Sequence, residues 1–165
     1  MSRVVQAVIM VGGKGTRLRP LTDTTPKPLL PIAGRPCLEY VIRSLSDSGI
    51  RQIILACGYR SEAISDFVGD GSSFHTEVLF AYEDEPAGTA GSVKLLEDRL
   101  EDVFVVASGD VLADVDMNGL INAHFAHGAA VTMALTRVDN PSEFGIVGLD
   151  SEGRVERFRE KPPPE

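Results

Sequence analysis

The sequence predicts an α/β fold in which a mainly parallel β-sheet is flanked by helices. Short, apolar, β-branched runs alternate along the chain with segments of helical periodicity. The helical segments are long enough to form right-handed crossovers between parallel strands. A chain of 165 residues, 43% of them hydrophobic, also suits one domain of common size with a real core. We therefore expect residues 1–165 to form a single domain.

The N-terminal part of the chain contains three predicted strand–helix pairs. The run VVQAVIM is β-branched and apolar, and the segment that begins at Pro36 has apolar residues at helical spacing up to a glycine stop at Gly49. The remaining runs follow the same alternation. The predicted strands are 4–10, 50–58 and 76–84, and the predicted helices are 36–49, 61–70 and 91–100.

The C-terminal part continues the alternation and then changes to a hairpin pattern. The run DVFVVASGD (102–110) is a strongly apolar strand, and it precedes a helix near 117–127 and a strand at 131–138. The runs FGIVGLD and RVERFREK are joined by SEG (151–153), which predicts two antiparallel strands.

The charge distribution favours a small anionic ligand over a nucleic acid. The net charge of −8 argues against general affinity for nucleic acids. Residues 1–36, however, hold six basic side chains and one acid, a local charge of +5, so the rest of the chain carries −13. A local basic patch in an acidic protein suits a small anion.

The sequence predicts no membrane span and no secretion signal. No apolar run approaches the ~20 residues that a spanning helix needs, and the apolar part of MSRVVQAVIMVGG is too short for a signal peptide. We therefore expect a cytoplasmic protein that does not bind membranes. Cys37 and Cys57 form no CxxC pair and lie beside no histidine cluster, so reduced, partly buried thiols are expected.

Three loops are predicted at the carboxyl ends of strands, where α/β sheets bind their ligands. They are VGGKGTRL (11–18), EDEPAGTAG (83–91) and SGDV (108–111). Their convergence on one edge of the sheet is a stronger indication of a site than any one loop alone.

The first loop is rich in glycine but matches neither common phosphate-binding motif. A GxGxxG motif starting at Gly13 needs glycine where Leu18 stands, and the Gly-Lys-Ser/Thr of a P-loop is absent. The glycines Gly12, Gly13 and Gly15 still allow backbone N–H groups to approach a phosphate closely. The alternative reading is a tight turn next to solvated cations.

Two cations strengthen the phosphate-binding interpretation of this region. Arg17 offers a forked, permanently charged donor, and Lys27 offers a point charge. Lys27 stands between Pro26 and Pro28 in TPKPLLP, and we expect the prolines to hold its backbone extended in one place. A rigid linker is the alternative for Pro-Lys-Pro alone.

Taken together, these motifs resemble the signature of the sugar-1-phosphate nucleotidyltransferases, also called NDP-sugar pyrophosphorylases. The long match is VGGKGTRLRPLTDTTPKPLLPIAGRP (11–36), followed in order by EPAGTAG (85–91), GDV (109–111), EFGIV (143–147) and EKP (160–162). The resemblance implies a Rossmann-like, glycosyltransferase-A-like fold. It also implies transfer of a nucleotidyl group from a nucleoside triphosphate to a sugar 1-phosphate, with Mg²⁺ and without a covalent enzyme intermediate.

The resemblance implies roles for the nucleotide-binding residues. The backbone of Gly12 and Gly13 would lie against the nucleotide. Gly15, Thr16 and Arg17 would hold its phosphates, with Arg17 neutralising the departing pyrophosphate.

The resemblance also implies the remaining site residues. Lys27 would hold the α-phosphate for in-line attack, and Asp110 would bind Mg²⁺, a hard cation that prefers carboxylates. Gly88 and Thr89 would border the base and ribose. The sugar-phosphate residues would be Gly145, Glu160 and Lys161. Read without the resemblance, Asp110 is a turn former at a strand end and Glu160–Lys161 is a solvated charge pair.

The stretches MVGGKGTRLRPLT, EDEPAGT and GDVL are most similar to those of mannose-1-phosphate guanylyltransferases. This similarity favours GTP and mannose 1-phosphate as substrates. Glucose-1-phosphate thymidylyl- or uridylyltransferase is the alternative enzyme, and a non-catalytic nucleotide-sugar-binding regulatory module is the alternative from another class. A dinucleotide-dependent oxidoreductase shares the α/β pattern but fails the glycine spacing.

The sequence departs from the resemblance at its C-terminus. Members of the family continue after EKP with further strands and a second aspartate for the metal, whereas this sequence stops at Glu165. The resemblance therefore implies a catalytic domain without its C-terminal portion, with weak turnover and better preserved nucleotide binding. The oligomeric state stays open, with a homo-oligomer as one alternative.

Overall fold

The computed structural model describes residues 4–13, 15–58, 61–83 and 87–163. The chain divides into two compact units, Met1–Ala130 and Val131–Glu165, which are described separately below.

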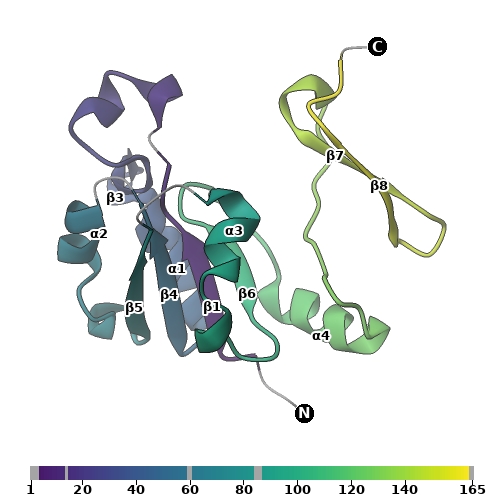
Figure 1. Cartoon of the computed structure of the whole chain (residues 1–165), viewed down its shortest axis with the longest axis horizontal. Coiled ribbons are helices and arrows are strands. Elements are labelled where there is room, and N and C mark those ends of the chain that lie inside the picture. The colour runs from purple at the N-terminus through teal and green to yellow at the C-terminus, as the bar shows by residue number, and fades with distance from the viewer. Residues whose placement is uncertain (1–3, 14, 59–60, 84–86, 164–165) are drawn as a thin grey trace. The chain divides into compact units, whose positions relative to one another are not determined.

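A four-stranded parallel sheet forms the centre of the first unit (Figure 1). Its strands are β1 (Gln6–Met10), β4 (Gln52–Cys57), β5 (Glu77–Tyr82) and β6 (Val105–Ser108). They lie in the order β5-β4-β1-β6, and every neighbouring pair is parallel. The predicted α/β class with a mainly parallel sheet is therefore confirmed.

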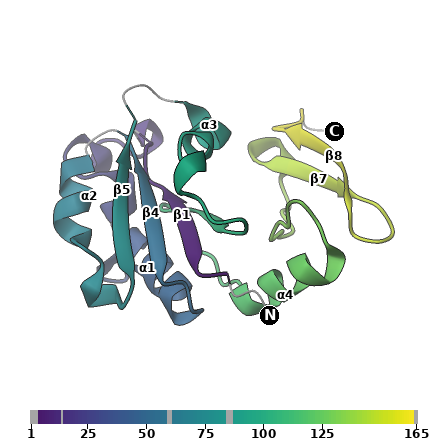
Figure 2. The same ribbon diagram turned by 60° about the horizontal axis from the view of Figure 1, so that its bottom comes forward.

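Helices cover both faces of this sheet, as the two views in Figures 1 and 2 show. The helices α1 (Cys37–Asp47), α2 (Ser61–Val68) and α4 (Met117–His127) contribute to one hydrophobic cluster with Ala7 and Ile9 of β1. Val8 points to the other face, where residues in and just after α3 (Gly88–Lys94) pack. The alternation along β1 thus buries both faces, as expected for a central parallel strand.

The segment between β1 and α1 consists of short turns. It contains the 3₁₀ helices η1 (Thr16–Leu18), η2 (Leu21–Asp23) and η3 (Lys27–Leu29), and the small hairpin of β2 (Pro31–Ile32) and β3 (Arg35–Pro36). The expectation that Lys27 is extended was wrong. Lys27 begins η3, and its carbonyl accepts a hydrogen bond from the Leu30 N–H at 3.1 Å, because the fixed φ of the next proline suits a 3₁₀ turn.

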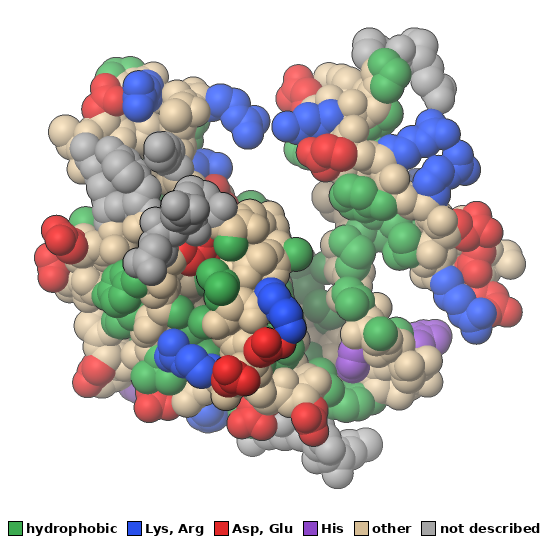
Figure 3. All heavy atoms as spheres, viewed as in Figure 1, with side chains coloured by type: hydrophobic (Ala, Val, Ile, Leu, Met, Phe, Trp, Pro, Cys, Tyr) green, Lys and Arg blue, Asp and Glu red, His purple; other side chains and the backbone are tan. Residues whose placement is uncertain are grey.

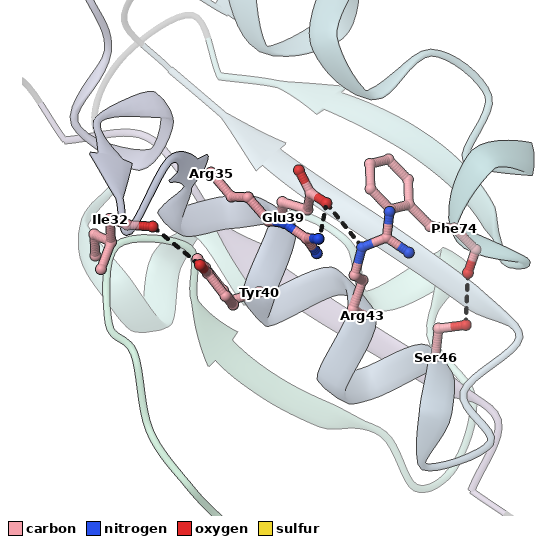
Figure 4. Close-up of polar contacts among 7 residues, drawn as sticks. All are labelled: Ile32, Arg35, Glu39, Tyr40, Arg43, Ser46 and Phe74. Carbon is pink, nitrogen blue, oxygen red and sulfur yellow. Dashed lines mark hydrogen bonds and ion pairs between the residues drawn. The ribbon is translucent and has the colours of Figure 1, made fainter.

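Polar contacts fix α1 to its neighbours (Figure 4). The Arg43 Nε donates to Glu39 Oε1 at 2.9 Å, and the Arg43 guanidinium lies 5.2 Å from the ring centre of Phe74 in η4 (Ser72–Phe74). The Tyr40 hydroxyl donates to the Ile32 carbonyl at 3.0 Å. These contacts hold α1 against β2 on one side and η4 on the other.

The second unit contains the predicted hairpin. The strands β7 (Gly145–Leu149) and β8 (Val155–Glu160) pair antiparallel, and η6 (Pro141–Glu143) precedes them. The predicted strand at 131–138 was wrong, because the structure has no strand there. A strand forms only when it pairs with a neighbouring strand, and no strand among the described residues forms a ladder with this segment, although Val131 and Met133 are apolar and exposed.

The other predicted elements agree with the structure apart from their limits. The predicted helix 91–100 is instead α3, which starts at Gly88, followed by the separate turn η5 (Glu97–Arg99). No helix within the described ranges has both the length and the apolar character needed to cross a membrane.

Both thiols are free and buried, which makes their reactivity testable. Burial, together with the nearby Glu83 charge, raises the pKa of Cys57 to about 12, and burial also raises the pKa of Cys37. At pH 8 the thiolate fraction of Cys57 is then about one in ten thousand. We expect neither cysteine to be alkylated by iodoacetamide in the native chain at pH 8 within an hour, and both to be alkylated in urea. Rapid native labelling of either residue, read by mass spectrometry, would contradict its burial.

Candidate active site

The strand order creates a natural ligand site at one edge of the sheet. The chain leaves β1 towards β4 on one side, and later returns to place β6 on the other side of β1. The order therefore reverses between β1 and β6, and α/β sheets bind ligands at the carboxyl ends of strands beside such a reversal. The glycine-rich segment 11–18, called the glycine loop below, follows β1, and Asp110 follows β6.

Gly109 allows these two strand ends to lie close together. Its N–H donates to the Met10 carbonyl at 2.9 Å. A Cβ on Gly109 would lie 2.6 Å from Val11 Cγ1 and 3.2 Å from Leu38 Cδ1, so no larger residue fits without displacement. The following residue, Asp110, is thereby placed directly beyond the β1–β6 pair.

Lys27 and Asp110 form an ion pair across this edge. Lys27 Nζ lies 2.6 Å from Asp110 Oδ2, although the residues are 83 positions apart in the sequence. The Lys27 side chain is 35% exposed and the Asp110 side chain 27% exposed, so solvent and ligands can reach both. The structure thus brings together two of the three residues predicted to be catalytic.

Asp110 is ionised at neutral pH. Partial burial opposes ionisation, but the hydrogen bond and positive charge of Lys27, with a hydrogen bond from Ser108, outweigh it and lower the pKa of Asp110. The ionised carboxylate is the form that binds a divalent cation.

The glycine loop leads from β1 towards this pair. Gly12 and Gly13 are exposed. Gly12 lies against the end of β4, because a Cβ on Gly58 would be 3.2 Å from the Gly12 carbonyl oxygen. Gly15 has φ of 61°, a left-handed conformation that favours glycine, and it starts η1. The backbone of the loop is therefore open on its outer side, as phosphate binding would need.

Thr16 and Arg17 lie in η1 and are exposed, and Arg19 follows them. Basic side chains gather over this segment at the top left of Figure 3, above the carboxyl edge of the sheet. Arg17 forms no ion pair among the described residues, whereas Arg19 lies 3.4 Å from Asp23. Arg17 is therefore available to an anionic ligand.

Gly88 and Thr89 are not joined to the Lys27–Asp110 pair by any hydrogen bond or ion pair in the parts of the chain that the structure describes. They are exposed at the start of α3, with Gly88 at φ of 74°. Residues 84–86 of the predicted loop lie outside the described residues. The order β5-β4-β1-β6 also separates this loop from the glycine loop by the width of β4.

Gly145, Glu160 and Lys161 meet in the hairpin of the second unit. Gly145 pairs with Glu160 in the β7–β8 register, and a Cβ on Gly145 would lie 3.1 Å from Glu160 Oε2. Lys161 Nζ lies 3.9 Å from Glu160 Oε1, with both side chains more than half exposed. The three predicted sugar-phosphate residues therefore form one cluster within their own unit.

Asp110 is the predicted metal ligand. Among residues 4–13, 15–58, 61–83 and 87–163, no group of three or more His, Cys, Asp or Glu could hold a metal ion. A cation at Asp110 would take its other ligands from water or from substrate phosphates, which is usual for Mg²⁺.

Sequence reasoning missed the residues that hold the site in shape. Ser108 hydrogen-bonds to Asp110, Gly109 permits the close approach of β6 to β1, and Thr22 is buried beside Gly15. Gly109 belongs to the GDV motif, but only the three-dimensional structure shows that a Cβ at this position would clash with its neighbours.

Gly109→Ala tests the close approach of the two strands. Because Val11, Ile9 and Leu38 around the added methyl are all buried, we expect the substitution to lower the free energy of unfolding by about 1–3 kcal/mol. Urea unfolding followed by circular dichroism would measure the change. Gly13→Ala is the matched control, because nothing lies within 4 Å of a Cβ there. Equal stability of the two variants would contradict the close approach.

Comparison with known proteins identifies the family to which the chain belongs. A profile of the nucleotidyl transferase family matches residues 6–165. The chain is 40% identical over 161 residues to the mannose-1-phosphate guanylyltransferase catalytic subunit beta of Drosophila pseudoobscura pseudoobscura, covering 95% of this chain and 43% of that protein. It is 41% identical over 158 residues to the mannose-1-phosphate guanylyltransferase of Mycobacterium tuberculosis, covering 95% of this chain and 44% of that protein.

A solved structure shows the same fold. The crystal structure of HddC from Yersinia pseudotuberculosis, complexed with GMP-PN, superimposes with a TM-score of 0.76 at 29% identity, covering 96% of this chain and 70% of that one. The chain spans less than half the length of the two mannose-1-phosphate guanylyltransferases compared above. The family profile spans residues 6–165, nearly the whole chain, and the chain therefore belongs to the nucleotidyl transferase family.

Proposed function

We propose that this chain binds the nucleotide in the transfer of a nucleotidyl group from a nucleoside triphosphate to a sugar 1-phosphate, which yields an NDP-sugar and pyrophosphate. The observation that carries the proposal is the Lys27–Asp110 pair, 2.6 Å apart at the sheet edge beside the glycine loop. The pair supports the proposal because it combines a cation and a carboxylate at the carboxyl ends of the strands, where α/β proteins bind their ligands.

The chemistry follows from the charges of the two substrates. An oxygen of the sugar phosphate attacks the α-phosphorus, and the bond from that phosphorus to the α–β bridging oxygen breaks, so that pyrophosphate leaves with the electron pair. The attacking phosphate has its second pKa near 6, so it is ionised at neutral pH and needs no general base. The protein must instead screen the repulsion between two anions and align them.

Cations on the first unit suit this task. Lys27 would hold the α-phosphate, and Arg17 would neutralise the pyrophosphate with its forked donors. The backbone of Gly12, Gly13 and Gly15, with Thr16, would line the nucleotide and its phosphates. The exposure of Arg17 and of the loop backbone supports these roles.

Asp110 fits Mg²⁺ as the cofactor. Its side chain is ionised, partly exposed and a hard oxygen donor, and Mg²⁺ is commonly bound by one or two carboxylates together with substrate phosphates. When bound, the ion would act as a Lewis acid that neutralises phosphate charge. Asp110 would then exchange its Lys27 partner for the cation, which frees Lys27 for the α-phosphate.

GTP and mannose 1-phosphate are the substrates that we propose. Two relatives at 40% and 41% identity are described as mannose-1-phosphate guanylyltransferases, and HddC, at 29% identity, was crystallised with GMP-PN. Gly88 and Thr89 would border the base and ribose, and the cluster of Gly145, Glu160 and Lys161 would receive the sugar phosphate. We further propose that both units belong to one catalytic domain and that the protein acts in the cytoplasm.

The test is pyrophosphate release with Mg²⁺ from GTP, dTTP, UTP, CTP and ATP, each paired with mannose 1-phosphate and with glucose 1-phosphate. It should be run on this chain, on a version extended to the length of the relatives, and on the Asp110→Asn variant of each. Release with GTP and mannose 1-phosphate that is lost in the variant supports the proposal. Release only with dTTP or UTP and glucose 1-phosphate would show that the proposed substrates are wrong. No release from the extended chain with any pair would contradict the proposed reaction itself.

A further inference from the structure

Thr22 is a buried polar residue next to the candidate site that the proposed chemistry does not use. It lies in η2 and is 6% exposed. Its hydroxyl Oγ1 donates a hydrogen bond to the Gly15 carbonyl at 2.9 Å. The same carbonyl accepts the Leu18 N–H at 2.9 Å, so Thr22 supplies one of its two hydrogen bonds.

The methyl group of Thr22 makes a second contact with Gly15. The space that a Cβ on Gly15 would occupy lies 2.9 Å from Thr22 Cγ2 and 3.1 Å from Lys27 Cβ. Gly15 therefore packs closely against both Thr22 and the stem of Lys27. Lys27 in turn forms the ion pair with Asp110. Thr22 is the buried member of this group.

We propose that Thr22 is a positioning residue for the glycine loop, whose phosphate-binding role rests on the proposed function. The hydroxyl holds Gly15 in its left-handed bend, and the bend sets the direction of η1, which contains Arg17. Gly15 in turn packs against the stem of Lys27. Thr22 thus links the two cations that are to meet the triphosphate, without touching the substrate itself.

Two substitutions separate the hydroxyl from the methyl group. Thr22→Val keeps the branched shape but removes the donor, and we expect it to weaken GTP binding by about tenfold, which is about 1.4 kcal/mol and the size of one lost hydrogen bond. Thr22→Ser keeps the donor and loses the methyl group. We expect its GTP affinity to stay within about threefold of wild type, since the bend is retained.

Thr76→Val is the matched control. Thr76 is also buried, at 7% exposed, and its Oγ1 has no hydrogen-bond partner among the described residues. It directly precedes β5, at the opposite end of the strand from the candidate site. We expect Thr76→Val to bind GTP like wild type and to be at least as stable, because it removes an unpaired buried hydroxyl.

Two readouts on this chain distinguish a failure of the positioning role from a failure of the proposed function. Isothermal titration calorimetry with GTP and Mg²⁺ measures binding. Limited trypsin digestion without nucleotide, with the Arg17–Leu18 cleavage followed by mass spectrometry, measures how firmly η1 is held. We expect Thr22→Val to be cleaved at this bond about tenfold faster than wild type, Thr22→Ser or Thr76→Val.

Weaker GTP binding together with faster cleavage in Thr22→Val would support the proposal. Unchanged GTP binding in Thr22→Val would overturn it, as would a loss in Thr22→Ser as large as that in Thr22→Val. If wild type binds no GTP, the proposed nucleotide is wrong, and the cleavage rates alone decide the positioning role. Faster cleavage in Thr22→Val then supports the role, and equal cleavage overturns it.

Discussion

Replacing Asp110 with asparagine is expected to lower the rate of pyrophosphate release from GTP and mannose 1-phosphate by more than about a thousandfold. A factor of a thousand corresponds to about 4 kcal/mol of transition-state stabilisation. The amide keeps the shape of the side chain but loses the charge that would bind Mg²⁺ and that pairs with Lys27 at 2.6 Å. Release should be followed with a coupled pyrophosphate assay on the extended chain at saturating Mg²⁺.

The same substitution should change stability little at neutral pH. The pair is partly exposed on both sides, so its loss should cost about 1 kcal/mol or less. The lowered pKa of Asp110 means that its contribution to stability is present above the unfolded pKa, about 3.9, and is lost as the pH falls through the folded value. Above pH 5, therefore, a loss of activity in Asp110→Asn cannot be ascribed to unfolding or to titration of this group.

Asp114→Asn is the matched control for Asp110→Asn. Asp114 is an exposed aspartate four positions further along the same connection, so its substitution makes the same change in charge near the site. We expect it to retain turnover within about twofold of wild type. Pyrophosphate release by Asp110→Asn within tenfold of wild type would exclude Asp110 as the metal ligand.

The sheet could be predicted from the sequence because its strands satisfy local and global requirements together. Runs such as VVQAVIM and IRQIILACG are apolar on both faces, and in the structure both faces of β1 and β4 are buried. Strand order, by contrast, depends on which crossovers pack, and no local pattern records that β1 and β6 are neighbours.

The segment 131–138 shows the opposite case. Its composition is that of a strand, but a strand is defined by its pairing with another strand, and no strand among the described residues pairs with it. An apolar run by itself predicts only a tendency to pair, so the sequence could not reveal whether the pairing is made. The hairpin 144–161 was predictable because both partners and their turn lie in one continuous stretch.

The charged residues of the candidate site could be predicted from the sequence, whereas the residues that hold them in place could not. Lys27 and Asp110 stand in motifs that the family resemblance identifies, and the fold brings them into contact from 83 positions apart. Thr22 contributes through its hydrogen bond to the Gly15 carbonyl. Gly109 contributes because it lacks a Cβ, which would clash with buried neighbours. Such effects depend on distances between separate segments, and residue type alone contains no information on them.

Lys27→Met should separate metal binding from turnover. Lys27 would compete with a cation for the Asp110 carboxylate, because its Nζ lies 2.6 Å from Asp110 Oδ2. Methionine keeps most of the apolar stem and removes the competing charge. We expect the affinity for Mn²⁺, used as a probe in place of Mg²⁺ and measured by calorimetry without nucleotide, to rise about three- to tenfold, which is the effect of about 1 kcal/mol.

Turnover should change in the opposite direction. Without the point charge on the α-phosphate, the two anionic substrates are less well screened and aligned, and we expect pyrophosphate release to fall by about a hundred- to a thousandfold. Lys94→Met is the matched control, since Lys94 is 72% exposed and pairs with Glu97 away from Asp110; it should change neither quantity. Weaker Mn²⁺ binding in Lys27→Met would show that Lys27 orders Asp110 for the metal rather than competing with it. Tighter metal binding together with lost turnover would instead establish that Lys27 must leave Asp110 for the substrate phosphate. Only in such an exchange does the charge of Lys27 both oppose binding of the cation and remain necessary for the reaction.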